Sequence, residues 1–336
     1  MHNFVQRKFG SSKFVGLIIA LSCLVNIAAL FSTSANQPGE EAALKALVER
    51  FFDAYAKRDL DGFMRLWSEK SPDYEFRKGV MQQILAKADY AFSNLTFKQI
   101  QLEGEKARLR ILVTLTEIDL KTKAQSTRKL DRIFSCVKEA DGWKIWRYYP
   151  AAEELAIALI NAATDEEREK LLEKENELLT IELVQVLLIL GDQRCKQNDL
   201  KSAVAIYQLA QNIAQRIGDW EGLVQSRDRE GIAHDLMGQL KEAMGAYEES
   251  INILQTFIEQ LQKAGEQEKV NRALQWRAAL LNDLGSFYQN RIGDPYRALA
   301  KYQEGLALSR KIGDRFLEAA ALNNVGGLHL DFGKFV

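Results

Sequence analysis

The sequence predicts an α+β domain over residues 40–150, followed by an all-α solenoid of repeated helical hairpins over residues 180–336. Two patterns support this fold class. In the first part, apolar residues recur every three or four positions and then change to strict alternation, so helices precede strands. In the second part, small and aromatic residues recur at a period of roughly 40 residues, which is typical of helical repeat proteins.

The composition is that of an ordinary globular protein. The chain is 47% hydrophobic and 27% charged, with a formal net charge of −1. This balance argues against a nucleic-acid partner, because phosphate binding requires a clustered basic surface. The histidines are few, and the cysteines form no metal-binding or disulfide pattern, so we expect no metal, no cofactor and no catalytic residue. We interpret Cys136 and Cys195 as buried small hydrophobes.

Residues 1–35 have the order of an export signal. Basic residues precede an apolar run over 14–31, and small residues follow it. We favour cleavage after Ala35. The alternatives are an uncleaved membrane anchor through residues 14–31 and lipidation at Cys23. All three predict an extracytoplasmic bacterial protein, which is periplasmic, secreted or anchored to the membrane.

The elements of residues 40–150 follow from periodicity. An amphipathic helix is expected first, then two short helices, then strands, the last two joined by an Asp-Gly hairpin turn at Asp141-Gly142. The expected helices cover 41–56, 61–67 and 80–90; alternation runs over 95–118, and the last strands cover 126–137 and 143–149.

Two segments of this domain resemble a known family. The run from Glu49 to Gly62 is similar to the opening helix and turn of SnoaL-like (nuclear transport factor two-like) domains, and Asp141 to Ile145 is similar to their closing hairpin. The resemblance implies a cone of curved sheet closed by helices, with a pocket at its mouth.

Some relatives in that family are enzymes, but the key donor is missing here. In ketosteroid isomerases, a tyrosine of the first helix donates a hydrogen bond to the oxyanion that develops during the reaction. The matching position here is Phe51, whose ring has no hydrogen-bond donor. We therefore interpret the domain as a non-catalytic binding or packing module. The expected pocket residues are Asp53, Tyr55, Arg110 and Arg132. Asp53 with Arg110 or Arg132 could form an acid-base pair, and a partly buried salt bridge is the favoured reading.

The second part resembles a tetratricopeptide-repeat array. Gly191, Gly231, Gly285 and Gly326 fit the small residue at position eight of the unit. Position twenty-four then holds Tyr207 and Tyr247, and a one-residue insertion around 292–295 brings Tyr302 to the same place. We expect three full repeats and a truncated fourth. The position-eight glycine should let the helices of one hairpin approach, and the aromatic residue should fill the groove to the neighbouring repeat.

The middle spacing is 14 residues longer than its neighbours, because Gly231 and Gly285 are 54 apart whereas Gly191 and Gly231 are 40 apart. We expect two lengthened helices, with a turn at 264–266, that project beyond the stack. Residues 151–179 should form a helical linker. This region is similar to the entry of bacterial tetratricopeptide/CHAT-type proteins, although no CHAT domain follows in this sequence. The sequence stops at Val336, where the second helix of the fourth repeat should begin. We therefore expect a fragment or truncated gene product; the alternative is a last helix that lacks its partner.

These features predict an exported scaffold whose repeats bind a protein or peptide. The expected exposed binding residues are Gln185, Asp228, Asn282, Gln289 and Asn323. Asn and Gln side chains suit an extended peptide because each amide donates and accepts. That they are merely solvated polar residues is an equally favoured alternative. Two further hypotheses use the SnoaL-like pocket: a sensor for a small apolar ligand, and an isomerase- or hydrolase-like enzyme.

Overall fold

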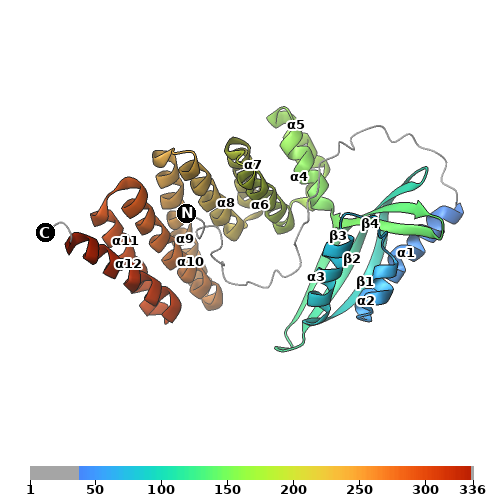
Figure 1. The fold of residues 1–336 in the computed structure, drawn as a ribbon, viewed down its shortest axis with the longest axis horizontal. Coiled ribbons are helices and arrows are strands. Elements are labelled where there is room, and N and C mark those ends of the chain that lie inside the picture. The colour runs from blue at the N-terminus through green and yellow to red at the C-terminus, as the bar shows by residue number, and fades with distance from the viewer. Residues whose placement is uncertain (1–37, 334–336) are drawn as a thin grey trace. The chain divides into compact units, whose positions relative to one another are not determined.

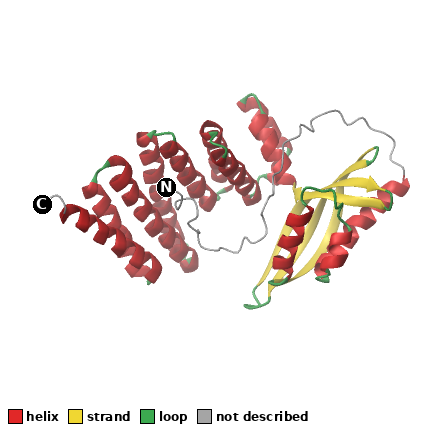
Figure 2. Ribbon diagram, viewed as in Figure 1, coloured by secondary structure: helices red, strands yellow, loops and turns green. Residues whose placement is uncertain are grey.

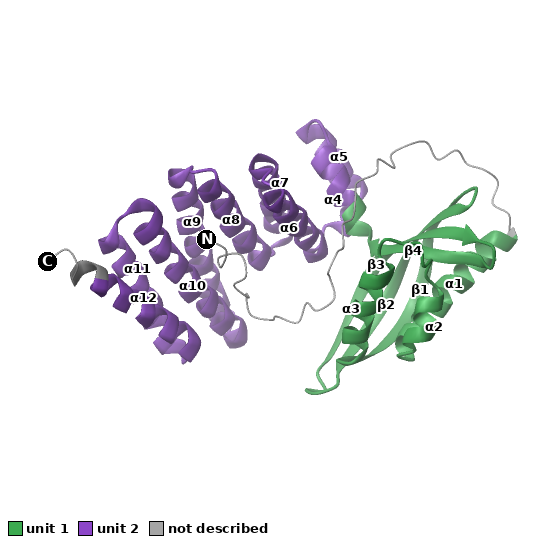
Figure 3. Cartoon of the chain, viewed as in Figure 1, with its two compact units in different colours: residues 1–154 green, residues 155–336 purple. Residues whose placement is uncertain are grey.

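The computed structural model describes residues 38–333, which form two compact units (Figure 3). The N-terminal unit ends at Glu154, and the C-terminal unit begins at Leu155. The predicted export segment and the apolar run over 14–31 lie outside the described residues. Within 38–333, no helix is both long enough and apolar enough to cross a bilayer.

The N-terminal unit contains three helices and then a four-stranded antiparallel meander in the order β1-β2-β3-β4 (Figures 1 and 2). This is the predicted α+β arrangement. The helices are α1 (Pro38–Ala56), α2 (Leu60–Arg65) and α3 (Tyr74–Leu85). The strands are β1 (Ala88–Glu103), β2 (Lys106–Asp119), β3 (Gln125–Glu139) and β4 (Gly142–Pro150).

Two predicted elements were wrong in extent. The third helix ends at Leu85 and not at Tyr90, because Ala88 and Tyr90 already alternate as buried residues of β1. The alternation over 95–118 belongs to two strands, β1 and β2, which turn at Gly104 with a φ of 57°. Only a residue that tolerates positive φ suits this turn. A short apolar run near a helix end fits both periods, so periodicity alone misplaced the boundary.

The core of the N-terminal unit lies between the helices and one face of the sheet. Alternate residues of β2 point into it, and Leu109 and Ile111 are fully buried. Phe51 of α1 lies at its centre, with ring centroids 4.7 Å from Phe63 and 5.0 Å from Phe134. The position that would carry a donor in ketosteroid isomerases is therefore part of an aromatic core.

The C-terminal unit is built from helices joined by short loops (Figure 1). Each helix from α6 onward packs against the next one along the chain. Before them come α4 (Ala151–Asn161), which begins in the last residues of the N-terminal unit, then α5 (Asp165–Lys174) and η1 (Asn176–Leu178). The repeats are formed by α6 (Ile181–Lys196), α7 (Leu200–Ile217), α8 (Trp220–Leu236), α9 (Leu240–Lys263), α10 (Gln267–Phe287), η2 (Tyr288–Ile292), α11 (Pro295–Ile312) and α12 (Arg315–Gly333).

A glycine and a tyrosine fix the register of each complete hairpin. A β-carbon at Gly285 would lie 2.6 Å from the ring of Tyr302, and Gly231 stands in the same relation to Tyr247 at 2.8 Å. The pair Gly191 and Tyr207 repeats this contact in the first hairpin. The tyrosine therefore packs inside its own repeat. Tyr247 also contacts the neighbouring repeat, because its ring centroid lies 5.3 Å from that of Phe287 on α10, as expected for this position.

The 14 extra residues lengthen α9 and α10, which have 24 and 21 residues. They turn at Gly265, whose φ is 72°. The extension packs against the start of α8, since the Trp220 ring lies 5.6 Å from Phe257 and 5.7 Å from Trp276. The one-residue insertion in the next hairpin is taken up by the π-helical turn Tyr288–Ile292.

Candidate protein-binding surface

The first helices of the hairpins, α6, α8, α10 and α12, form the surface on which solenoid proteins commonly bind partners. We call it the first-helix face. Within it α6 packs against α8, and α10 packs against α12.

Three of the five predicted binding residues reach this surface. Asn323 of α12 is exposed, and Gln185 of α6 and Gln289 of η2 are half-buried. Gln289 accepts a hydrogen bond of 2.9 Å from the hydroxyl of Tyr302. Exposure was wrongly predicted for the other two, since Asp228 is 7% exposed and Asn282 is 3% exposed.

Both buried residues occupy position five of their repeats, and the reason for their burial lies in the hairpin packing. In the first repeat this position is Leu188, which is also buried. Asn282 donates to the carbonyl of Ala278, and its amide lies beside Gly305 of α11. Its Oδ1 atom is buried without a donor among the described residues. Position five therefore faces the interior in these repeats, and polar groups there are costly.

Asp228 is the most unusual group on this face. Its carboxylate accepts no hydrogen bond from any described residue. Burial, together with the negative charge of Asp283 on α10, raises its pKa to about 7, and Arg229 opposes this only in part.

The arginines around Asp228 are engaged elsewhere. Arg229 donates from Nε to both oxygens of Asp192 on α6, at 3.0 and 3.3 Å. Arg291 donates from Nε to Asp235 at 2.5 Å and from a second nitrogen to the Asp235 carbonyl. These pairs hold α6 to α8 and α8 to η2.

Tyr247 of α9 lies among the same acids. Burial and the charges of Asp228, Asp235 and Asp283 raise the pKa of its hydroxyl. Its counterparts Tyr207 and Tyr302 donate to Asp192 and Gln289 at 2.8 and 2.9 Å. Among the described residues, the Tyr247 hydroxyl has no such partner.

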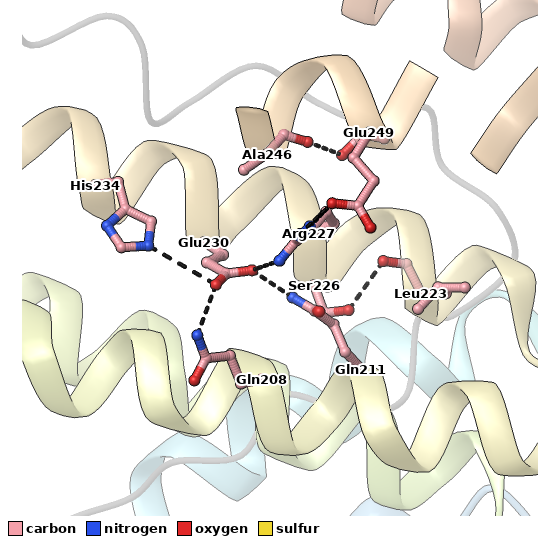
Figure 4. Close-up of polar contacts among 10 residues, drawn as sticks. Gln208, Gln211, Leu223, Ser226, Arg227, Glu230, His234, Ala246 and Glu249 are labelled. Carbon is pink, nitrogen blue, oxygen red and sulfur yellow. Dashed lines mark hydrogen bonds and ion pairs between the residues drawn. The ribbon is translucent and has the colours of Figure 1, made fainter. Parts of the chain in front are cut away.

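A second polar cluster, centred on Glu230 of α8, joins the first two repeats (Figure 4). Glu230 is almost fully buried and accepts from Gln208 and Gln211 of α7 at 2.8 and 2.6 Å. Arg227 donates to Glu230 at 2.6 Å and to Glu249 of α9 at 2.9 Å. Glu230 therefore links α8 to α7, and Arg227 links α8 to α9.

Burial acts to raise the pKa of Glu230, but the hydrogen bonds from Gln208, Gln211 and Arg227 outweigh it, and the pKa is lowered. Sequence reasoning missed this cluster. Its signal was an acid at position seven, where the first and third repeats have Leu190 and Leu284. A charge at a position otherwise occupied by leucine predicts a paired, buried group.

A cleft of about 840 Å³ lies elsewhere in the C-terminal unit, between α4–α5 and α7. Apolar residues such as Leu172 and Ile213 line it together with polar ones. Arg216 of α7 donates to Glu169 of α5 at 2.9 Å. The cleft is distinct from the first-helix face, because its lining residues come from α4, α5 and α7.

The structure disperses the four residues predicted for the N-terminal pocket. Asp53 is exposed and pairs with Lys57 at 2.8 Å, so its predicted pairing with Arg110 or Arg132 was wrong. Arg110 instead donates from two nitrogens to Asp131 at 3.0 Å, on the sheet face away from the helices. Tyr55 lies in the aromatic core, with its ring 4.9 Å from that of Tyr90, and Arg132 is buried on β3.

A charged cluster that sequence reasoning missed lies inside the N-terminal unit. Arg147 of β4 contacts Asp73 at 3.5 Å and Glu153 at 3.2 Å, and both acids are buried. Arg77 stacks over the Trp67 ring at 5.4 Å, and burial lowers its pKa. The charges are mutually compensating, which suits a structural role.

The cysteines differ in burial. Cys136 is buried, which raises the pKa of its thiol, whereas Cys195 is half-buried, so the interpretation of both as buried hydrophobes holds only for Cys136. No group of three or more metal-binding side chains occurs within residues 38–333.

Comparisons with known proteins identify the C-terminal part. Residues 182–256 match the model of the tetratricopeptide repeat family. A comparison with curated proteins gave no match.

Solved structures with similar parts include a conserved protein of Planctomyces limnophilus, at 16% identity and a TM-score of 0.31, covering 34% of this chain and 99% of that one. A ketosteroid isomerase-like protein of Erwinia carotovora atroseptica has 17% identity and a TM-score of 0.31, covering 33% and 95%. A signal transduction ATPase of Pyrococcus horikoshii with a tetratricopeptide-repeat sensor has 19% identity and a TM-score of 0.37, covering 54% of this chain and 26% of that one.

At these identities and TM-scores, the structural likenesses bear on neither substrate nor partner. The family match spans the glycine–tyrosine contacts of the first two hairpins. This chain is therefore an α+β unit followed by an array of helical hairpins, and residues 182–256 of that array match the tetratricopeptide repeat family, whose repeats indicate protein–protein interaction.

Proposed function

We propose that this chain is a non-catalytic scaffold that binds a peptide segment of a partner protein on the first-helix face. The observation that carries the proposal is the set of amide side chains that are exposed or half-buried along these repeats, with Gln185 on α6, Gln289 on η2 after α10, and Asn323 on α12. Amide side chains pair with an extended peptide backbone because each can donate and accept.

Site-specific photocrosslinking in the cells that make the protein tests this proposal. A photoreactive residue at Gln185 or Asn323 should give a discrete crosslinked partner. The control places the same group at Glu242, an exposed residue of the second helix α9. Equal crosslinking from Glu242, or none from either first-helix position, would contradict binding on this face.

The absence of catalysis is supported by Phe51, a buried ring at the position where ketosteroid isomerases supply a donor. A screen of small apolar ketones and esters should find no turnover that depends on the N-terminal unit. Turnover that Asp53→Asn abolishes would contradict a non-catalytic role.

We also propose that the protein acts outside the cytoplasm. The order of basic residues, apolar run and small residues over 1–35 supports export. N-terminal sequencing of the mature protein should begin at Asn36. A soluble cytoplasmic product that retains Met1 would contradict this proposal.

A further inference from the structure

The cleft between α4–α5 and α7 has the size of a small-molecule site. Its volume is about 840 Å³, and small-molecule sites commonly enclose roughly 300–1,000 Å³. No aromatic ring lines it in the part of the chain that the structure describes. The lining therefore suits an aliphatic chain better than a flat ring system, which would stack on aromatic side chains. Buried aliphatic residues from all three helices contribute to it, namely Leu159, Leu172, Ile206 and Ile213.

The α7 wall of the cleft is long. The residues that line it include a stripe with alternating spacings of three and four, as neighbours on one side of a helix have. This stripe extends from residue 202 to residue 216, which is about 21 Å at 1.5 Å per residue. A ligand that follows this wall is elongated. The stripe consists of Ser202, Ala205, Leu209, Asn212 and Arg216.

In the middle of this stripe, α7 differs from the other second helices. Leu209 occupies the position that holds Glu249 in α9 and Glu304 in α11. Each of these acids pairs with an arginine of the preceding first helix, Glu249 with Arg227 and Glu304 with Arg277. Leu209 is half-buried and lines the cleft. The α7 helix therefore contributes an apolar group to the cleft where its counterparts have a charge.

The charged groups that line the cleft are already paired. Arg216 of α7 donates to Glu169 of α5 at 2.9 Å. Arg168 of α5 contacts Asp165 and donates to the carbonyl of Leu159 at 3.2 Å. Two arginines therefore balance two acids, and the same contacts hold α5 to α4 and to α7. A charged ligand would find no uncompensated partner here and would still lose its hydration.

Uncharged polar groups of the cleft have no partner of this kind. Asn212 is exposed and Ser202 is half-buried, and neither side chain forms a hydrogen bond with another described residue. The Asn212 amide offers both a donor and an acceptor. Hydroxyl, ester or amide groups of a ligand can pair with these side chains without the cost of burying a charge.

We propose that the cleft binds a neutral, elongated aliphatic molecule that carries an uncharged polar group. The aliphatic chain lies along the α7 stripe against Ala205 and Leu209, and the polar group pairs with Asn212. Burial of the chain against the aliphatic lining drives binding. The cleft is lined by α4, α5 and α7, so this site is separate from the peptide site proposed on the first-helix face.

The test is titration calorimetry of the full chain with monodecanoyl glycerol, below the concentration at which this probe forms micelles. The probe should bind saturably. Decanoate has the same acyl chain with a charged end, and it should bind at least about tenfold more weakly because its carboxylate finds no unpaired cation. Glycerol lacks the chain and should not bind.

Two substitutions locate the binding. Ala205→Leu places a larger side chain in the cleft, and Leu209→Glu introduces the acid that α9 and α11 carry at this position. Each should weaken binding of monodecanoyl glycerol at least about tenfold. Ala300→Leu is the matched control, because Ala300 is the exposed equivalent of Ala205 on α11 and does not line the cleft. Thermal melts establish that each variant is folded.

The outcomes separate cleanly. Binding that both cleft variants weaken and that Ala300→Leu retains supports the inference. The inference is overturned if monodecanoyl glycerol does not bind, if Ala205→Leu and Leu209→Glu bind it as tightly as the wild type, or if decanoate binds equally well. Equal weakening in Ala300→Leu also overturns it, because binding would then not depend on the cleft. All of these outcomes leave the proposed peptide site intact.

Discussion

The Tyr302 ring lies so close to Gly285 that a β-carbon on this glycine would come within 2.6 Å of it. The same contact joins Gly231 to Tyr247. In each of these hairpins, the tyrosine ring of the second helix therefore packs directly against the backbone of the first helix at a glycine. The contact also fixes where the tyrosine hydroxyl lies at the first-helix face. The same tyrosine therefore packs the hairpin and contributes to the proposed binding surface.

Gly285→Ala should destabilise the protein by about 1–3 kcal/mol, because the methyl group overlaps the Tyr302 ring and the hairpin must open. Gly245→Ala is the matched control: it lies in α9 with nothing within 4 Å of its added β-carbon. This control should stabilise by up to about 1 kcal/mol through helix propensity. Urea denaturation measures both, and equal effects would contradict the close contact.

Glu230→Ala should cost about 2–4 kcal/mol, since it leaves Gln208, Gln211 and Arg227 without their shared acceptor. The double change Arg227→Leu with Glu230→Leu restores the apolar pattern of the first and third repeats and should be neutral or stabilising. Urea denaturation midpoints of Glu230→Ala and of the double variant measure this difference in stability. A double variant as unstable as Glu230→Ala would show that the cluster is required for packing.

Asp228→Asn should raise the melting temperature at about pH 8 and have little effect at about pH 4. The pKa of Asp228 is raised from 3.8 to about 7, so the folded protein retains a proton that the unfolded chain has lost over this window. Stability attributable to this group therefore falls as pH rises between those values. Calorimetry across the window should show the gap opening with pH, and a constant gap would indicate that Asp228 is ionised throughout.

Asp53→Asn should leave the melting temperature unchanged, because Asp53 is exposed and pairs only with Lys57 on the same helix. Asp131→Asn is the contrasting change. Asp131 is largely buried and receives two hydrogen bonds from Arg110, so its loss should cost about 1–3 kcal/mol. A larger effect at Asp53 than at Asp131 would contradict these placements.

The sequence by itself determined the fold class and the repeat register. Alternation and helical periodicity separate the two parts, and the glycines at 191, 231 and 285 predict the hairpins because only glycine leaves room for the facing helix. The lengthened α9 and α10 also followed from spacing, since the extra residues must form whole helical turns.

Only the tertiary structure decided which polar residues are buried and with what they pair. Asp228 and Asn323 occupy the same repeat position, yet Asp228 is buried and Asn323 is exposed, because burial depends on the neighbouring helices. The pairing of Asp53 with Lys57, and of Arg110 with Asp131, depends on strand register and helix face. Electrostatic partners separated along the chain are brought together by packing, and no local pattern in the sequence encodes their distance.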